Sequence, residues 1–347
     1  MDESGFSATK AFTDDMLTWV RGRGKKILII VHDNPDPDCL ASAMALRHLF
    51  NVKLNKEAVI AFSGMIGRSE NLAMAKELQI PLTPFPILNL TDFHVICMLD
   101  TQPGTGNNSL PLDATVDIVI DHHPVRPESS RCRWVDIRDE YGVTATILYE
   151  YLLTQEVPIS TKIATALFYA IKSETQDLGR EANKPDREAY TRLFPLTNKI
   201  LLYMITRPKL PVEYFLAIHT AVENTFIHGP VLTSVLGKIQ FPELVAELAD
   251  FLLRLENIET VLCMGLYNDE LIISLRTLRI DINAGEIIKV LVDGMGSAGG
   301  HGMMAGGKID NVTAFPGGSE KIAQLLKDKL LSILGIQALE TQKLIPY

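Results

Sequence analysis

The stretch KKILIIVHDNPDPDCLASAMALRHLF, residues 25–50, decides the fold class. Its first eight residues form a nearly continuous apolar run, which is typical of a strand buried on both faces of a parallel sheet. A short polar segment with two prolines follows, and then a helical pattern rich in alanine and leucine over 39–50. A strand that leads directly into a helix is the repeating unit of α/β folds, so this stretch predicts a parallel sheet.

The same alternation continues through the first half of the chain. Apolar strand-like runs occur at 57–64, 94–100 and 117–123, and helical patterns occur at 69–78, 143–154 and 160–173. Near-continuous apolar strands separated by helices indicate a parallel sheet that is covered on both faces. We therefore predict an α/β domain over residues 1–185.

The second half has a different organisation. A helical pattern interrupted by Pro195, Pro208 and Pro211 predicts a helical connector over 186–230. A second α/β rhythm follows, with strands at 233–239, 260–267 and 271–277, helices at 242–254, 284–293 and 319–334, and a glycine-dense loop at 294–307. We predict a smaller α/β domain over 231–347.

Composition excludes several classes of protein. The 347 residues are 47% hydrophobic and 22% charged, as in ordinary globular proteins, and the longest apolar runs fall short of the roughly 18–20 residues of a membrane span. With no leader-like N-terminus and four cysteines in no CxxC pair, we expect a cytoplasmic protein without membrane contact. The net charge of −9 excludes coating of duplex nucleic acid but allows a short anionic ligand gripped locally.

Acidic and imidazole side chains gather where the predicted strands end. His32, Asp36 and Asp38 follow the first strand, Asp100 ends the third, and Asp121, His122 and His123 end the fourth. The carboxyl ends of parallel strands form the ligand crevice, so these groups should converge. Taken singly, the Asn34–Asp38 segment and Asp100 also suit plain turns. Unpaired carboxylates that converge repel one another, and divalent cations would relieve that repulsion.

The ligand types restrict the metal. Oxygen and imidazole ligands without a thiolate favour Mn²⁺, with Mg²⁺, Co²⁺ or Fe²⁺ as alternatives, and disfavour a structural zinc site. Cys39 is interpreted as a packing residue. Five or six ligands exceed the need of one catalytic ion, and two ions about 3.5–4 Å apart that share a carboxylate would use them all. Such a pair supports in-line attack on phosphorus.

A second group of candidate residues lies in the second half. The glycines of 294–307, among them Gly299, Gly300 and Gly306, allow the backbone N–H groups to approach an anion closely. His301 adds a side-chain donor, and Arg276 offers a guanidinium suited to phosphate. A flexible turn is the plain alternative for the loop.

These motifs resemble the DHH phosphoesterase superfamily. The pattern from His32 to Asp38, with Asp100 and the Asp121-His122-His123 triplet, is similar to its N-terminal domain, and Gly299-Gly300-His301 with Ala305-Gly306 is similar to the C-terminal domain of its RecJ-like branch. The resemblance covers nearly the whole chain and is strongest to short members that degrade oligoribonucleotides, dephosphorylate pAp or hydrolyse dinucleotides.

The resemblance implies roles for individual residues. His32 and Asp36 would bind one Mn²⁺, Asp38 and His122 the other, and Asp100 would bridge them. His123 would contact the scissile phosphate and Asp121 would orient the histidines. The fourth family motif usually reads Thr-Asp-Thr, whereas this chain has Ser173-Glu174-Thr175, so Glu174, or alternatively Asp177, would complete the site. The family's glycine-histidine loop contacts substrate, and Arg276, Arg180 and Arg68 are further candidates.

Three functions remain open from the sequence. The leading hypothesis is a Mn²⁺-dependent phosphoesterase that acts on short nucleotides such as nanoRNA, dinucleotides or pAp. The second is hydrolysis of a phosphoanhydride, pyrophosphate or polyphosphate, although the Ser-Arg-Lys-Lys-type motif of the related type II pyrophosphatases is not found. The third is a nucleotide-binding sensor with weak catalysis, which only Glu174 suggests. Apolar positions in the helical connector make a homodimer an expectation.

Overall fold

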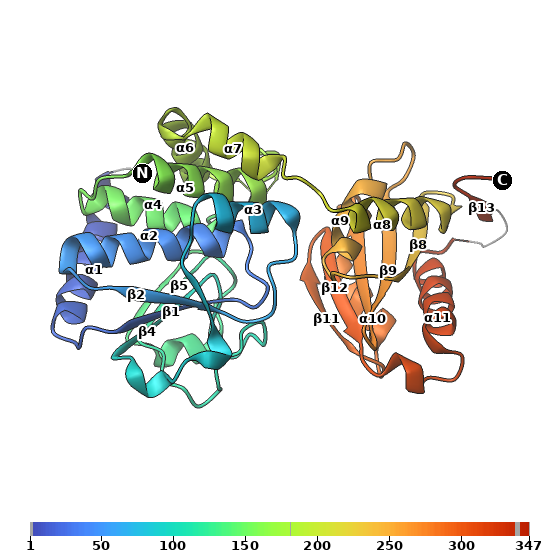
Figure 1. Ribbon diagram of the computed structural model, residues 1–347, viewed down its shortest axis with the longest axis horizontal. Helices are drawn as coiled ribbons and strands as arrows, with labels where there is room; N and C mark the ends of the chain where they lie inside the picture. Colours follow the sequence, from blue (N-terminus) through green and yellow to red (C-terminus); the bar gives the residue numbers. More distant parts are fainter. Residues whose placement is uncertain (1–2, 181, 337–340, 347) are drawn as a thin grey trace. The chain divides into compact units, whose positions relative to one another are not determined.

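The computed structural model describes residues 3–180, 182–336 and 341–346. The chain divides into two compact units, Met1–Pro208 and Lys209–Tyr347, each built around its own sheet (Figure 1). The predicted pair of α/β domains is therefore confirmed. The helical connector predicted over 186–230 is divided between the two units, because the boundary falls after Pro208. Across these described ranges, no helix is both long and apolar enough to cross a membrane.

The first domain contains a six-stranded parallel sheet in the order β3-β2-β1-β4-β5-β6. Its strands are β1 (Ile27–Val31), β2 (Ala58–Phe62), β3 (Leu82–Pro84), β4 (Val95–Leu99), β5 (Ile118–Asp121) and β6 (Trp134–Ile137). The strand order reverses between β1 and β4. At such a reversal the loops leave the two strands in opposite directions, which opens a crevice at their carboxyl ends.

The two faces of this sheet are covered differently. The α-helices stack on one face in Figure 1, and short 3₁₀ segments and loops cover the other. Ile27 and Ile29 of β1 pack into the core on the helical side, whereas Leu28 and Ile30 pack into a smaller cluster on the other side. The helices are α1 (Glu3–Arg21), α2 (Pro37–Leu54), α3 (Ser69–Glu77), α4 (Thr144–Thr154), α5 (Thr161–Glu174), α6 (Lys184–Leu193) and α7 (Lys199–Thr206). Among these, α1 was not predicted.

The second domain has a seven-stranded mixed sheet in the order β11-β12-β10-β9-β8-β7-β13. Its strands are β7 (Thr225–His228), β8 (Val231–Lys238), β9 (Thr260–Tyr267), β10 (Glu270–Thr277), β11 (Ser297–His301), β12 (Met304–Ile309) and β13 (Thr341–Lys343). Its helices are α8 (Val212–Glu223), α9 (Leu244–Leu252), α10 (Ala284–Val292) and α11 (Gly318–Ile333). Among the strands described here, β8 and β9 pair in parallel and the other neighbours pair antiparallel.

The glycine-dense stretch is a hairpin rather than the predicted loop. Strands β11 and β12 pair antiparallel, and β12 pairs with β10. Gly300 has φ +146°, and a Cβ there would lie 2.5 Å from the Cα of Ala305. The glycines thus let two strands lie very close together, which a side chain would prevent.

Candidate metal centre

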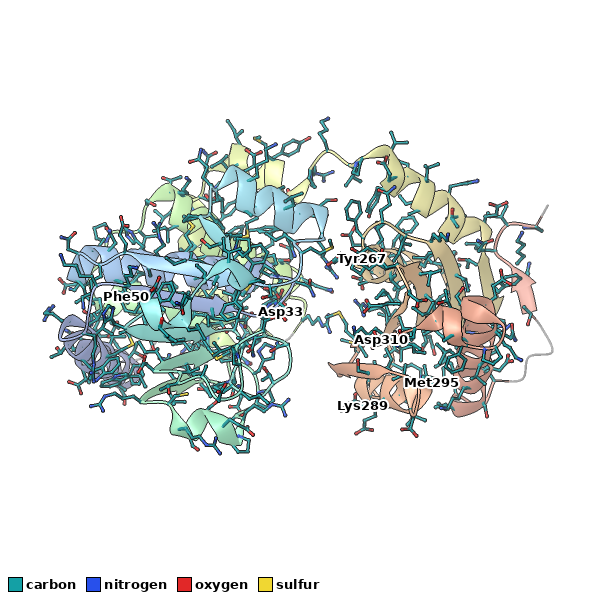
Figure 2. The ribbon with its side chains drawn as sticks, turned by 60° about the horizontal axis from the view of Figure 1, so that its bottom comes forward. Asp33, Phe50, Tyr267, Lys289, Met295 and Asp310 are labelled. Carbon is teal, nitrogen blue, oxygen red and sulfur yellow. The ribbon has the colours of Figure 1, made fainter. Side chains whose placement is uncertain are left out.

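The segment after β1 turns sharply so that its acidic residues meet the start of α2. Asp36 caps this helix, because its carboxylate accepts the N–H of Cys39 at 3.0 Å, and Pro37 occupies the first helical position. Asn34 has φ +57°, and its side chain accepts the N–H of Met65. Asp33 and Phe50 lie towards opposite ends of α2 in Figure 2.

Asp100 is the centre of the cluster. It follows β4 with φ +58°, a conformation rarely adopted by residues other than glycine and asparagine. One of its carboxylate oxygens lies 3.6 Å from Nε2 of His32, and the other lies 3.6 Å from Nε2 of His122. The carboxylate therefore faces one histidine on each side, as a bridging ligand would.

Both histidines are held through their other ring nitrogen. Nδ1 of His32 lies 2.9 Å from the backbone carbonyl oxygen of Asp33, and Nδ1 of His122 lies 3.2 Å from the backbone carbonyl oxygen of Tyr141. A carbonyl can only accept, so each Nδ1 carries a proton and each Nε2 is the ring nitrogen that faces the carboxylates, from where it could bind a metal. Nε2 of His32 also lies 3.4 Å from Asp36, and that of His122 lies 3.8 Å from Asp38.

The start of α4 holds two of the carboxylates. Asp38 accepts the backbone N–H groups of Thr144 and Ala145, both at 2.7 Å, and the Thr144 hydroxyl donates to Asp100 at 2.9 Å. Asp38 and Asp100 are almost fully buried. The N-terminus of a helix carries a partial positive charge, which offsets part of the repulsion between these two anions.

Glu174 at the end of α5, and not Asp177, lies against this cluster. Burial, followed by the charges of Asp36 and Asp100, raises the pKa of Glu174 to about 8. Asp177 is bound by Lys172 and by the hydroxyl of Tyr190 and is largely exposed. Of the two residues left open by the sequence, Glu174 is the one that interacts with the charges of the cluster, and its role as a metal ligand stays a prediction.

The carboxylates repel one another strongly without a cation. Burial raises the pKa of Asp38 well above its usual range, and the charges of Asp100, Asp36 and Glu174 raise it further. Burial and Asp36 likewise raise the pKa of Asp100. A divalent cation would stabilise this arrangement of oxygen and imidazole groups, so the residues fit a metal site.

Potential ligand atoms form two groups in the described chain. One is His32, Asp36 and Cys39, and the other is Asp100, His122 and His123. The sequence interpretation of Cys39 as a packing residue agrees with its full burial, although its thiol also lies within the first group. Two neighbouring ligand groups that meet at Asp100 would suit a pair of ions.

Asp121 orients one histidine only. Its carboxylate accepts Nδ1–H of His123 at 2.9 Å, whereas the ring of His122 is held by Tyr141. Burial lowers the pKa of His123, but this hydrogen bond and the charges of Asp100, Asp121 and Asp36 together raise it to about 9. The His123 side chain is 42% exposed, against 19% for His122. His123 is thus the more accessible imidazole.

Gln102 is a buried residue that the sequence did not single out. Its Nε2 donates to Asp121 at 2.7 Å, and its Oε1 accepts the backbone N–H of Arg126 and the hydroxyl of Ser129. Gln102 thus fixes the carboxylate that fixes His123. The signal available was its position two residues after Asp100. Thr144 was missed as well, and neither residue is charged.

The predicted substrate residues of the second domain line a cavity of about 310 Å³. Gly299, Gly300 and Gly306 border it, together with Arg276, whose guanidinium donates to Asp250 at 2.6 Å. His301 ends β11, but its side chain lies outside the described part of the structure.

Arg180 belongs to the first domain. Its backbone N–H binds the carbonyl of Thr175, in the turn that follows Glu174. Arg68 precedes α3, and its charge acts on Glu174. Both arginines therefore lie on the side of the first domain that carries the metal centre.

Comparison with known proteins agrees with this division of the chain. Residues 26–171 match the DHH family N-terminal domain, and residues 228–329 match the DHHA1 domain. An uncharacterised protein of Methanocaldococcus jannaschii is 35% identical over 319 residues, which are 90% of this chain and 64% of the relative.

Other similarities cover the chain to different extents. A protein named probable manganese-dependent inorganic pyrophosphatase from Staphylococcus saprophyticus is 28% identical over 152 residues, 43% of this chain and 48% of the relative. The chain thus spans about half to two thirds of the length of these relatives. A solved structure of an exopolyphosphatase-related protein from Bacteroides fragilis shares the fold, with a TM-score of 0.72 and 16% identity over 93% of this chain and 96% of that protein.

Proposed function

Since the chain belongs to the DHH superfamily, with a DHH domain followed by a DHHA1 domain, we propose that it is a metal-dependent phosphohydrolase. The observation that supports this best is the convergence of Asp38, Asp100 and Glu174 with the Nε2 atoms of His32 and His122. Manganese in the name of the staphylococcal relative and the oxygen–imidazole ligands both favour Mn²⁺.

The residues have separable tasks in this proposal. His32, Asp36, Asp38, Asp100, His122 and Glu174 would hold two divalent ions, which would neutralise the carboxylates and stabilise the charge that develops on a phosphoryl group. His123, exposed and protonated near neutral pH because of Asp121, would donate a hydrogen bond to a phosphate oxygen. Gln102 and Thr144 would position these groups.

We propose short nucleotides as the substrates: nanoRNA, dinucleotides or pAp. The cavity of the second domain supports this choice. Apolar side chains of Val245, Ile272 and Met304 and a glycine-rich wall surround it, and its arginine is already paired with Asp250. An apolar cavity suits a nucleoside, whereas a chain of phosphates would require several unpaired cations.

A phosphoanhydride is the second candidate substrate. The similarity to probable inorganic pyrophosphatases favours it, since the same pair of metal ions would serve either reaction. Contacts outside the metal centre would then decide whether the protein prefers nucleotides or phosphoanhydrides.

A substrate panel with the Mn²⁺-loaded protein tests both. We expect turnover of a short RNA, the dinucleotide ApA or pAp, and little turnover of pyrophosphate or polyphosphate. Asp100→Asn should lower kcat by more than about 100-fold, because it removes the shared charge. Asp33→Asn is the matched control, since Asp33 binds Ser109 instead and should leave kcat nearly unchanged. Preference for pyrophosphate or polyphosphate would reverse the substrate assignment. Binding of a nucleotide without hydrolysis would favour the third hypothesis, a nucleotide-binding sensor with weak catalysis.

A homodimer remains a prediction. Helices α7 and α8 expose several apolar side chains: Ile200, Tyr203, Val212, Phe215 and Leu216. Sedimentation of the full chain at micromolar concentration would measure the oligomeric state.

A further inference from the structure

We propose that Asp250 is a specificity-determining residue that makes the second-domain cavity select a substrate end without a terminal phosphate. This inference rests on the proposed function and narrows its substrate class. It concerns the ion pair between Asp250 of α9 and Arg276 of β10.

Protein groups already bind the Arg276 guanidinium at two of its three nitrogens. Its Nε donates to Asp250 at 2.6 Å, and its Nη1 donates to the carbonyls of Leu275 and Ala305 at 3.1 and 3.2 Å. The Arg276 side chain is only 8% exposed, so these bonds are shielded from water. A phosphate that approached Arg276 would have to compete with the carboxylate and would meet its negative charge.

The rest of the cavity does not compensate for this pairing. Among the residues described as lining it, Arg276 has the one charged side chain, and the others are glycine, small or apolar residues and Ser274. Helix α9 supplies part of the wall through Val245 and Ala246. Glu243 and Glu247 flank these wall residues in the sequence, but neither they nor Asp250 line the cavity directly.

Ser274 indicates what the cavity accepts instead. Within the described chain its hydroxyl has no hydrogen-bond partner, although the residue is only 2% exposed and lines the cavity. A buried hydroxyl without a partner is unfavourable, and a neutral ligand group would satisfy it. An apolar cavity with one neutral donor and acceptor matches a nucleoside whose terminal oxygen is a hydroxyl.

The wild-type protein gives the first test. With Mn²⁺, kcat/KM is compared for ApA, for pApA with a 5′-phosphate, and for ApAp with a 3′-phosphate. We expect ApA to exceed at least one of the phosphorylated dinucleotides by about 10-fold or more. Equal or better hydrolysis of both phosphorylated dinucleotides overturns the inference. The same logic predicts that dinucleotides are better substrates than pAp.

Asp250→Asn gives the second test. It keeps the side-chain shape and removes the charge, so we expect kcat/KM of the disfavoured phosphorylated dinucleotide relative to ApA to rise by about 10-fold. Asp250→Glu, which keeps the charge, should stay within twofold of the wild-type ratio. Asp281→Asn is the matched control, since it breaks an exposed pair with Arg279 elsewhere in the same domain.

The possible outcomes distinguish the role of Asp250 from the proposed function. If all proteins hydrolyse dinucleotides and Asp250→Asn leaves the ratio unchanged, the role of Asp250 is refuted and the proposed function stands. If the wild type hydrolyses pyrophosphate but no dinucleotide, the proposed function fails, and the inference fails with it. Thermal unfolding of each variant identifies a folding defect, in which case the wild-type comparison still decides.

Discussion

Replacing Glu174 with glutamine should stabilise the metal-free protein and weaken its response to metal. Burial and the charges of Asp36 and Asp100 raise the pKa of Glu174 from 4.5 to about 8. At pH 7 the unfolded chain carries an ionised glutamate, which must take up a proton on folding. The interval of about 2.5 pH units corresponds to about 3 kcal/mol as an upper limit.

The sign of the pH dependence follows from this shift. Between pH 4.5 and 8 the folded state binds more protons at Glu174 than the unfolded state, so wild-type stability falls as pH rises. Glutamine does not titrate and removes this contribution. The advantage of Glu174→Gln should therefore be largest above pH 8 and disappear below about pH 4.5.

Thermal unfolding after EDTA treatment measures the effect. A gain of about 1–3 kcal/mol raises Tm by about 3–10 °C in a domain of roughly 200 residues. Added Mn²⁺ should raise Tm of the wild type more than that of the variant. Asp177→Asn is the control, since Asp177 binds Lys172 and Tyr190 instead, and its Mn²⁺ response should match the wild type. A Glu174→Gln protein that is no more stable without metal, with an unchanged Mn²⁺ response, would refute the placement of Glu174 in the cluster.

Three further predictions concern other residues. Thr144→Val removes the hydroxyl that donates to Asp100 and should weaken Mn²⁺ binding, measured by calorimetry, about 10-fold. Thr144→Ser keeps a hydroxyl and should bind Mn²⁺ as the wild type does. Equal Mn²⁺ affinities of the wild type and Thr144→Val would contradict the role of Thr144 in positioning Asp100. Lys56→Met removes an ammonium that donates to backbone carbonyls at the end of α1, and should lower the free energy of unfolding in urea by about 1–3 kcal/mol. An unchanged urea midpoint would show that these hydrogen bonds do not stabilise the fold. Burial, followed by the charge of Lys327, lowers the pKa of His228 in the folded protein. Since the unfolded chain then binds the proton more readily, the free energy of unfolding of the wild type should fall as pH falls below about 6.5. His228→Gln should lose less stability than the wild type between pH 7.5 and 5.

The fold was predictable where side-chain periodicity carried the signal. Each apolar run of the first half became a central strand of the parallel sheet, because a strand buried on both faces needs apolar residues throughout. Helix α1 precedes this alternation of strands and helices and was not predicted, although its buried residues Met16, Leu17 and Val20 recur at helical spacing. The β11–β12 hairpin was invisible for another reason: glycine has no side chain to reveal alternation, and pairing with β10 decides its conformation.

The centre of the site was predictable from chain position. Strand ends in a parallel sheet meet at one edge, so Asp100 and the Asp121–His123 triplet had to lie near the segment after β1. The choice of Glu174 over Asp177 required the path of the chain after α5. Gln102 and Thr144 required it too, because a neutral residue gains its role only from the partner that the fold brings to it.

The fold holds these acids together before any metal arrives. Asp38 receives two backbone N–H groups from the start of α4, which the helix holds in place, and Asp100 receives the Thr144 hydroxyl. Burial and acidic neighbours raise the pKa of both Asp38 and Glu174, because they disfavour the charged form of each carboxyl. Metal binding at these carboxylates should therefore release protons. Glu174, which stands where the family motif usually has an aspartate, would thus be a ligand whose charge depends on the metal, whereas the charge of Asp38 is also stabilised by the backbone of α4.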